Sequence, residues 1–239
     1  GNRVRVTGQL IDARDGAHVW ADRFDRDLTD IFAVQDELTQ EIIAALKLRL
    51  TPEQKGRLAR KGNIDSEAYN FFLRGREQAL VLTKQNNVEA RSLFERAIAI
   101  SPDFAAAHAY IAFTHLNDYI AGSVEATAGV LDAIMEIAER AVRMDDEDPH
   151  VHWILAEAHL WRREHDAALV QARRCLELAP SSGEGQFALA NIQFYVGDAA
   201  GALRTIESYM QFDPFYHEIL LFFLAQAHEG LAQYDRAVD

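Results

Sequence analysis

This chain of 239 residues lacks several features that mark particular classes of protein. Its single cysteine, Cys175, excludes an internal disulfide framework and any site with several cysteine ligands, and it fits a reducing cytoplasm. The longest apolar run, Ile219 to Ala225, has seven residues, whereas a membrane span needs roughly 20. Neither G-x-G-x-x-G nor G-x-x-x-x-G-K-S/T occurs. We therefore expect no nucleotide site, no cofactor and no membrane span here. Since the chain begins with Gly1 and has no signal peptide, we expect a cytoplasmic segment of something longer.

Positive charge is also scarce. Lys and Arg number 24 against 37 Asp and Glu, a net charge of −13, and this excess repels phosphate backbones and anionic lipid. The imbalance is uneven, because residues 1–62 hold 11 basic and 10 acidic side chains, whereas residues 63–239 hold 13 and 27. The sequence therefore predicts two parts and argues against nucleic-acid binding.

The first part reads as two strands and a helix. Apolar and polar residues alternate over 3–11 and again over 18–24, and the Asp-Gly between these runs is typical of a hairpin turn. Over 28–50 the apolar period changes to that of a helix. A hairpin and one helix bury too little surface to be stable alone, so we expect an α+β fragment of a larger module over 1–50, followed by a linker over 51–63.

The second part has a repeating helical pattern. Pro180 lies 34 residues before Pro214, and the same interval separates Ala168 from Ala202. A small residue recurs at repeat position 8, counted from the first residue of each repeat, at Ala112, Ala156 and Ala190. This pattern resembles tetratricopeptide repeats (TPRs), whose period is 34 residues. The resemblance implies a mainly α protein: a right-handed α–α superhelix over 64–239, with four full repeats and part of a fifth.

Two repeats depart from this spacing. Repeat 2, over 105–148, has ten extra residues around 119–129, which predict either a longer turn or an extended helix. In repeat 1, Gly75 takes the small-residue position about three residues early. At the other end of the array, an uncapped apolar face predicts either truncation or a covering partner.

The first part has a resemblance of its own. The amino-acid sequence of residues 2–13, 16–21, 24–27 and 30–37, including His18-Val19-Trp20-Ala21, resembles the C-terminal part of the TolB-like module that precedes TPRs in bacterial signalling proteins. In that family the arrangement most often follows a class III adenylate or guanylate cyclase domain, and less often a winged-helix DNA-binding domain. The resemblance implies an upstream output domain, so no catalytic residue is carried onto this chain.

Candidate chemical groups have simpler interpretations. His108/His115 and His152/His159 share a spacing of seven, which suits a metal but equally suits packing at repeat positions 4 and 11. The acidic run 145–148 lacks the pattern of a calcium loop and suits a helix start. Cys175 falls at a close-packing position without a neighbouring base. We therefore predict no catalytic or metal residue, and no enzyme activity of this chain alone.

The register predicts an interaction groove instead. In TPR arrays, positions 2, 5, 9, 12 and 13 of each first helix point into the concave surface. The groove candidates are Tyr69, Phe72, Arg76, Phe113, Asn117, His150, Trp153, Glu157, Trp161, Phe187, Asn191, Phe194 and Tyr195. This set is aromatic rather than basic, so we expect a partner segment that is apolar or aromatic, with Asn117 and Asn191 bonding its backbone. An aromatic stripe is also typical of burial, by the 28–50 helix, by the insertion or by a second copy in a homodimer, and a small apolar ligand is a further alternative.

We therefore predict a non-catalytic regulatory region of a cyclase-type signalling protein, coupling partner binding or dimerisation to an upstream domain. Two alternatives remain open: the TPR region of a winged-helix transcriptional regulator, and a metal-dependent enzyme in a helical solenoid. The sequence preceding Gly1 and the metal content would separate them.

Overall fold

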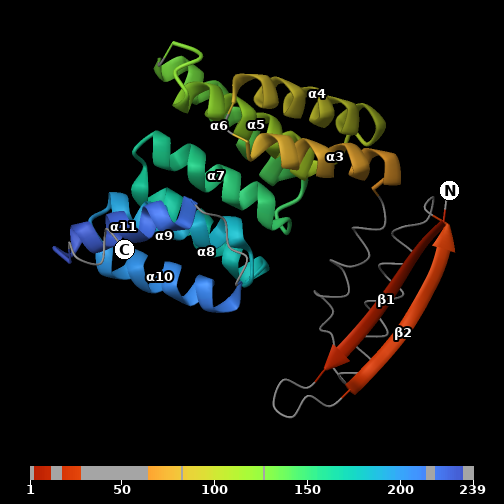
Figure 1. The fold of residues 1–239 in the computed structure, drawn as a ribbon. Helices are drawn as coiled ribbons and strands as arrows, with labels where there is room; N and C mark the ends of the chain where they lie inside the picture. The colour runs from red at the N-terminus through yellow and green to blue at the C-terminus, as the bar shows by residue number, and fades with distance from the viewer. Residues whose placement is uncertain are drawn as a thin grey trace.

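The computed structural model describes residues 3–11, 18–27, 64–81, 83–125, 127–213 and 219–233. Two strands come first, β1 (Arg3–Ile11) and β2 (His18–Asp27), followed by nine helices in these residues (Figure 1). The strands pair antiparallel, with Arg3 opposite Asp27 and an irregularity between Leu10 and Ile11. The hairpin prediction is confirmed, while its turn, the predicted helix over 28–50 and the linker over 51–63 lie outside the described residues.

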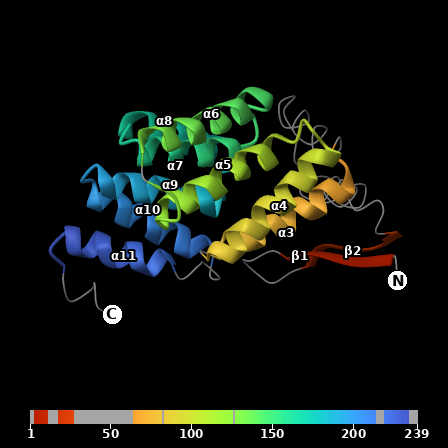
Figure 2. The same cartoon turned by 90° about the horizontal axis from the view of Figure 1, so that it is seen from above.

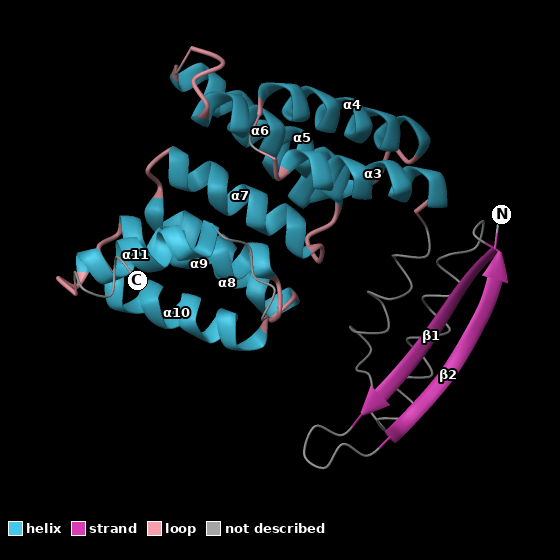
Figure 3. Cartoon of the chain, in the orientation of Figure 1, coloured by secondary structure: helices cyan, strands magenta, loops and turns pink. Residues whose placement is uncertain are grey.

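The helices form consecutive antiparallel pairs (Figure 3). Their bounds are α3 (Ser66–Ala79), α4 (Lys84–Ile100), α5 (Ala105–Ile120), α6 (Ala128–Met144), α7 (Pro149–Trp161), α8 (His165–Leu178), α9 (Gly183–Tyr195), α10 (Ala199–Phe212) and α11 (Ile219–Gly230). The odd-numbered members are the first helices of successive repeats, and each packs against the next first helix. The described second helices do not pack closely against one another. The first helices therefore form the inner layer of a TPR superhelix, and the mainly α prediction is confirmed (Figure 2).

Local sequence signals start these helices. Asp65, Asp148 and Ser182 each accept a hydrogen bond from a backbone N–H in the first turn of α3, α7 and α9. Such caps satisfy donors that have no partner within the helix. At the turns that follow α7 and α9, Arg163 and Gly197 adopt left-handed backbone angles, φ 63° and 84°. These two positions are 34 residues apart, so the turn repeats with the sequence.

The extra residues of repeat 2 lengthen both its helices and the turn between them, so both of the predicted outcomes occur. The helices α5 and α6 have 16 and 17 residues, against 13 and 14 in α7 and α8. The connection between them grows to residues 121–127, against 162–164 in the next repeat. Both helices are therefore extended by about one turn, and the turn between them is longer as well.

The core explains the glycine of repeat 1. Ala112, Ala156 and Ala190 are all buried where first and second helices touch, as predicted. In repeat 1 the neighbouring second helix carries Phe94, and a Cβ added at Gly75 would lie 2.6 Å from its ring. Ala172 occupies the position equivalent to Phe94 in repeat 3. Repeat 1 therefore has glycine instead of alanine at this position because the facing side chain, Phe94, is larger than an alanine.

No helix in the described ranges is long and apolar enough to cross a membrane.

Candidate interaction surface

The first helices carry all thirteen groove candidates on one layer of the array, here called the inner face. Contacts between neighbouring first helices bring together α5 with α7 and α7 with α9 (Figure 1). Residues at corresponding repeat positions consequently lie beside one another, and the candidates form a continuous set rather than isolated side chains.

Two of the aromatic candidates are packing residues. Phe72 and Trp153 have only 2% and 3% of their surface exposed. The Trp153 ring centroid lies 4.9 Å from that of Phe113 and 5.6 Å from that of Tyr110, while Phe72 lies 5.3 Å from Tyr110. Ring pairs at these distances stabilise a core beyond the area they bury. For Phe72 and Trp153 the structure therefore favours burial between repeats over an open aromatic surface.

The other aromatic candidates remain accessible to different degrees. Tyr195 is the most exposed, at 56%. Phe187 packs edge-on against Phe223 of α11, with ring centroids 4.9 Å apart. The half-buried candidates are Tyr69, Arg76, Phe113, His150, Trp161, Phe187 and Phe194. These side chains therefore keep part of their surface accessible.

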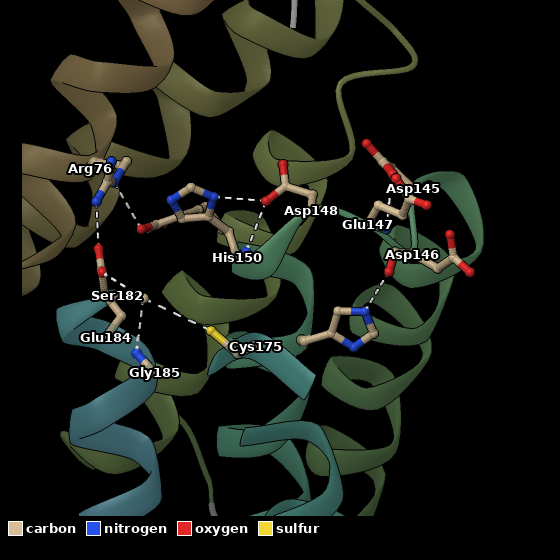
Figure 4. Close-up of polar contacts among 12 residues, drawn as sticks. Arg76, Asp145, Asp146, Glu147, Asp148, His150, Cys175, Ser182, Glu184 and Gly185 are labelled. Carbon is tan, nitrogen blue, oxygen red and sulfur yellow. Dashed lines mark hydrogen bonds and ion pairs between the residues drawn. The ribbon is translucent and has the colours of Figure 1, made fainter. Parts of the chain in front are cut away.

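Arg76 joins the first and fourth repeats. Its Nε donates to the Tyr110 hydroxyl at 2.9 Å, and its Nη2 donates to Glu184 Oε1 at 2.5 Å (Figure 4). Because Arg76 lies on α3 and Glu184 on α9, 108 residues separate the ends of this ion pair. We call Arg76, Tyr110 and Glu184 the latch. It shows that the only predicted basic groove residue is already engaged by the array itself.

Electrostatics in the latch favour the charged pair. Burial acts to raise the pKa of Glu184, but its own backbone N–H and the Arg76 guanidinium outweigh burial and hold the pKa below its usual value. Burial raises the pKa of Tyr110, which stays a neutral hydroxyl accepting from Arg76. Glu184 is therefore ionised at neutral pH and bound to its partner.

Ser182 and Cys175 lie next to the latch (Figure 4). The Ser182 hydroxyl accepts from Gly185 N at 3.1 Å and donates to Glu184 Oε2 at 3.3 Å, while the Cys175 thiol lies 3.9 Å from it. Burial raises the pKa of Cys175 to about 11, so the thiol is protonated at neutral pH. The interpretation of Cys175 as a small buried residue is confirmed.

The acidic run and the histidines also have structural roles. Asp148 caps α7 and contacts His150 Nδ1 at 2.8 Å (Figure 4). His152 is bonded at both ring nitrogens, to Gln171 and to the Asp146 carbonyl, each at 2.8 Å. His159 instead contacts Glu164 at 2.6 Å. Among the described residues no group of three or more His, Cys, Asp or Glu side chains could hold a metal ion.

A second set of polar side chains on the inner face contains unpaired atoms. Trp153 Nε1, Glu157 Oε1 and Asn191 Oδ1 are buried and have no hydrogen bond from the described residues. Burial alone raises the pKa of Glu157 to about 7. We call these three side chains the unpaired trio. Asn117, expected to bond a ligand backbone, differs from them because its Nδ2 donates to the Ala79 carbonyl at 3.3 Å and so ties α5 to α3.

Sequence reasoning missed the latch for an identifiable reason. Tyr110 follows a groove position by one residue and reads as a core residue, which it also is, at 1% exposure. Its partner Arg76 is 34 residues away, one repeat earlier. Because the spacing of repeat 1 is irregular, this interval does not put the two side chains at the same repeat position, and it gave no signal for the hydrogen bond. The pairing with Glu184 depends on superhelical curvature, which repeat spacing does not specify.

Comparisons with solved structures place the fold among TPR proteins. TTC0263, a thermophilic TPR protein from Thermus thermophilus, aligns over 84% of this chain and 96% of its own, with a TM-score of 0.55 and 16% identity. PilF from Pseudomonas aeruginosa aligns over 72% of both chains, with a TM-score of 0.50 and 14% identity. The described helices therefore form a TPR superhelix, and the class of protein that this fold defines is the TPR class. No protein-family model matches the chain.

Comparisons with curated sequences add a more specific relative. "Putative adenylate cyclase 3" from Rhizobium meliloti is 40% identical over 167 residues, which are 70% of this chain and 28% of the relative. Human "Tetratricopeptide repeat protein 34" is 28% identical over 101 residues, 42% of this chain and 18% of its own length. The chain thus spans under a third of either relative.

Proposed function

We propose that this chain is the protein-interaction region of a class III adenylate or guanylate cyclase-type signalling protein. The observation that carries the proposal is the 40% identity over 167 residues to the protein named "Putative adenylate cyclase 3". The TPR superhelix supports the interaction role, since it presents a continuous layer of first helices. In this proposal the chain binds and regulates, and the cyclase chemistry belongs to a separate domain of the natural protein.

The proposed organisation follows the resemblance and the charge distribution. Residues 1–50 would close a TolB-like module, 51–63 would be a linker and 64–239 would be the regulatory array. Most of the negative charge lies on 63–239, with 27 acidic and 13 basic residues. That charge coats the array and disfavours nucleic acid as its partner. The location proposed for the protein is the cytoplasm.

The proposed partner is a protein or peptide segment with apolar or aromatic residues, and a second copy of the chain is one such partner. Half-buried Phe113, Phe187 and Phe194 and exposed Tyr195 supply the apolar contact surface. Class III cyclases complete their active site across a dimer, so an array that brings two copies together would raise catalytic output.

Cyclic-nucleotide synthesis by the natural full-length protein tests this proposal. The intact protein is compared with one lacking 64–239 and with the double variant Phe194→Ala and Tyr195→Ala, using ATP and GTP as substrates. We expect synthesis to rise with protein concentration and both changes to reduce that rise at least fivefold. Val170→Ala, on the exposed side of a second helix, is the matched control. The proposal is contradicted if the intact protein makes no cyclic nucleotide from ATP and none from GTP. It is also contradicted if both altered proteins keep the concentration dependence of the intact one.

A further inference from the structure

Three unpaired polar atoms are concentrated on two neighbouring helices. Trp153, Glu157 and Asn191 have 3%, 5% and 8% of their surface exposed, and one polar atom of each lacks a hydrogen bond. Leaving a buried polar atom unpaired costs roughly 1–3 kcal/mol. An array that otherwise satisfies its inner-face charges, as at Arg76 and Glu184, therefore carries an unexplained cost at this place.

The register brings these side chains to one stretch of the inner face. Trp153 and Glu157 are four residues apart on α7, so they lie on the same side of that helix. Asn191 occupies the position equivalent to Glu157 one repeat later, on α9, which packs against α7 (Figure 1). The register therefore puts the trio at neighbouring positions of two adjacent repeats.

The free atoms define a ligand chemistry. The Glu157 carboxylate and the Asn191 amide oxygen accept hydrogen bonds, and the Trp153 indole N–H donates one. An ammonium or guanidinium group supplies the donors that the two acceptors lack, and a peptide carbonyl supplies an acceptor for the indole N–H. No basic side chain of the described residues pairs with Glu157. A cation from another molecule would supply what Arg76 supplies to Glu184.

We propose that Trp153, Glu157 and Asn191, whose free atoms are enclosed in this structure, bind the Lys or Arg side chain of an extended partner segment when the inner face opens to admit it. This proposal rests on the proposed function and specifies the partner, which combines a basic residue with the apolar residues that the surrounding rings contact. The excess of 27 acidic over 13 basic residues in 63–239 attracts such a segment.

A positional-scanning library of acetylated decapeptides tests this proposal on the full 239-residue chain. We expect selection for Lys or Arg at one library position, beside selection for apolar residues. The best peptide is then measured by fluorescence anisotropy against Glu157→Gln, which keeps the size of the side chain but removes its charge. The expected loss is tenfold or more, since hydrogen bonds to charged groups contribute about 1.5–3 kcal/mol. Glu136→Gln, an exposed acid on α6, is the matched control with an expected change under twofold.

A second peptide and a second variant separate charge from folding. Replacing the selected Lys or Arg by norleucine should weaken binding to the wild-type chain about tenfold and leave no further effect of Glu157→Gln. Trp153→Phe, which keeps a ring and removes the N–H, should weaken the basic peptide severalfold with an unchanged melting transition. Equal losses in Glu157→Gln and Glu136→Gln overturn the site, as expected if only a buried water or a neutral acid occupies it. Selection of apolar residues without a basic one overturns the site and leaves the proposed function standing, whereas a library with no binder contradicts both.

Discussion

The latch and the unpaired trio are two polar regions of the same inner face with opposite electrostatics. In the latch, Glu184 is paired with Arg76 and its pKa lies below the usual value. In the trio, Glu157 Oε1 has no hydrogen bond from the described residues, and burial raises the pKa of Glu157 to about 7. The difference teaches that burial alone does not set the role of an acidic residue in this array. The paired acid, Glu184, joins α3 to α9 through its ion pair. The unpaired acid, Glu157, carries a free-energy cost of burial that a bound cation would reduce.

The largest predicted effect removes packing near both regions. Trp153→Ala deletes the ring that contacts Tyr110 of the latch and Phe113, both on α5. Because the ring is 3% exposed, the expected loss is about 3–5 kcal/mol in the free energy of unfolding. Chemical denaturation followed by circular dichroism measures it. A loss under about 1 kcal/mol would mean that the ring lies on the surface.

The next effect is the pH dependence of Glu157. Its pKa is raised from 4.5 to about 7, so its contribution to stability is fully present below pH 4.5 and is lost as pH rises through 7. Glu157→Gln should therefore become more stable than wild type by up to about 3 kcal/mol between pH 4 and 8. Denaturation of both proteins across this range measures the difference. Parallel curves would contradict the prediction.

Glu184 should behave in the opposite sense. Its pKa is lowered, so its contribution is present above its unfolded-state pKa and is lost as pH falls. Glu184→Gln should be less stable than wild type at neutral pH, and the difference should shrink in acid. This variant is thus the matched comparison for Glu157→Gln.

Breaking the latch from the other side has a smaller effect. Arg76→Met leaves Glu184 without its cation and Tyr110 without its donor, and we expect a loss of about 2 kcal/mol because both ends of the pair are partly exposed. A double-mutant cycle with Glu184→Gln isolates the coupling. If the two single losses simply add, the ion pair contributes nothing measurable to stability.

The smallest predicted effect concerns the start of α9. Ser182→Ala removes the hydroxyl that accepts from Gly185 N and donates to Glu184. A lost helix cap costs about 1 kcal/mol. A thermal melt of the variant measures the change, and Ser181→Ala, beside the cap, serves as the control. A change equal to that of the control would show that the Ser182 hydroxyl does not stabilise the start of α9.

The repeat architecture was predictable because it depends on local and periodic signals. Alanine at position 8 and the caps at Asp65, Asp148 and Ser182 report contacts within one repeat. Gly75 was read as a departure in spacing, and its physical reason, the ring of Phe94, needed the three-dimensional packing.

The inner face was predictable only as a set of positions. Register placed thirteen residues on the first helices but could not rank their exposure, which runs from 2% for Phe72 to 56% for Tyr195. Exposure depends on how closely neighbouring first helices approach. The raised pKa of Glu157 depends on its burial without a basic side chain of the described residues beside it, and the pairing of Glu184 depends on Arg76 reaching from α3 to α9.

Carbon-detected NMR titration of the glutamate carboxyl groups in the full chain tests the central contrast most directly. The account predicts that Glu157 titrates near pH 7 and Glu184 below its ordinary value of 4.5. It further predicts that a bound Lys- or Arg-containing peptide lowers the pKa of Glu157 and leaves that of Glu184 unchanged. A Glu157 carboxyl that titrates at or below 4.5 in the free chain would contradict the account.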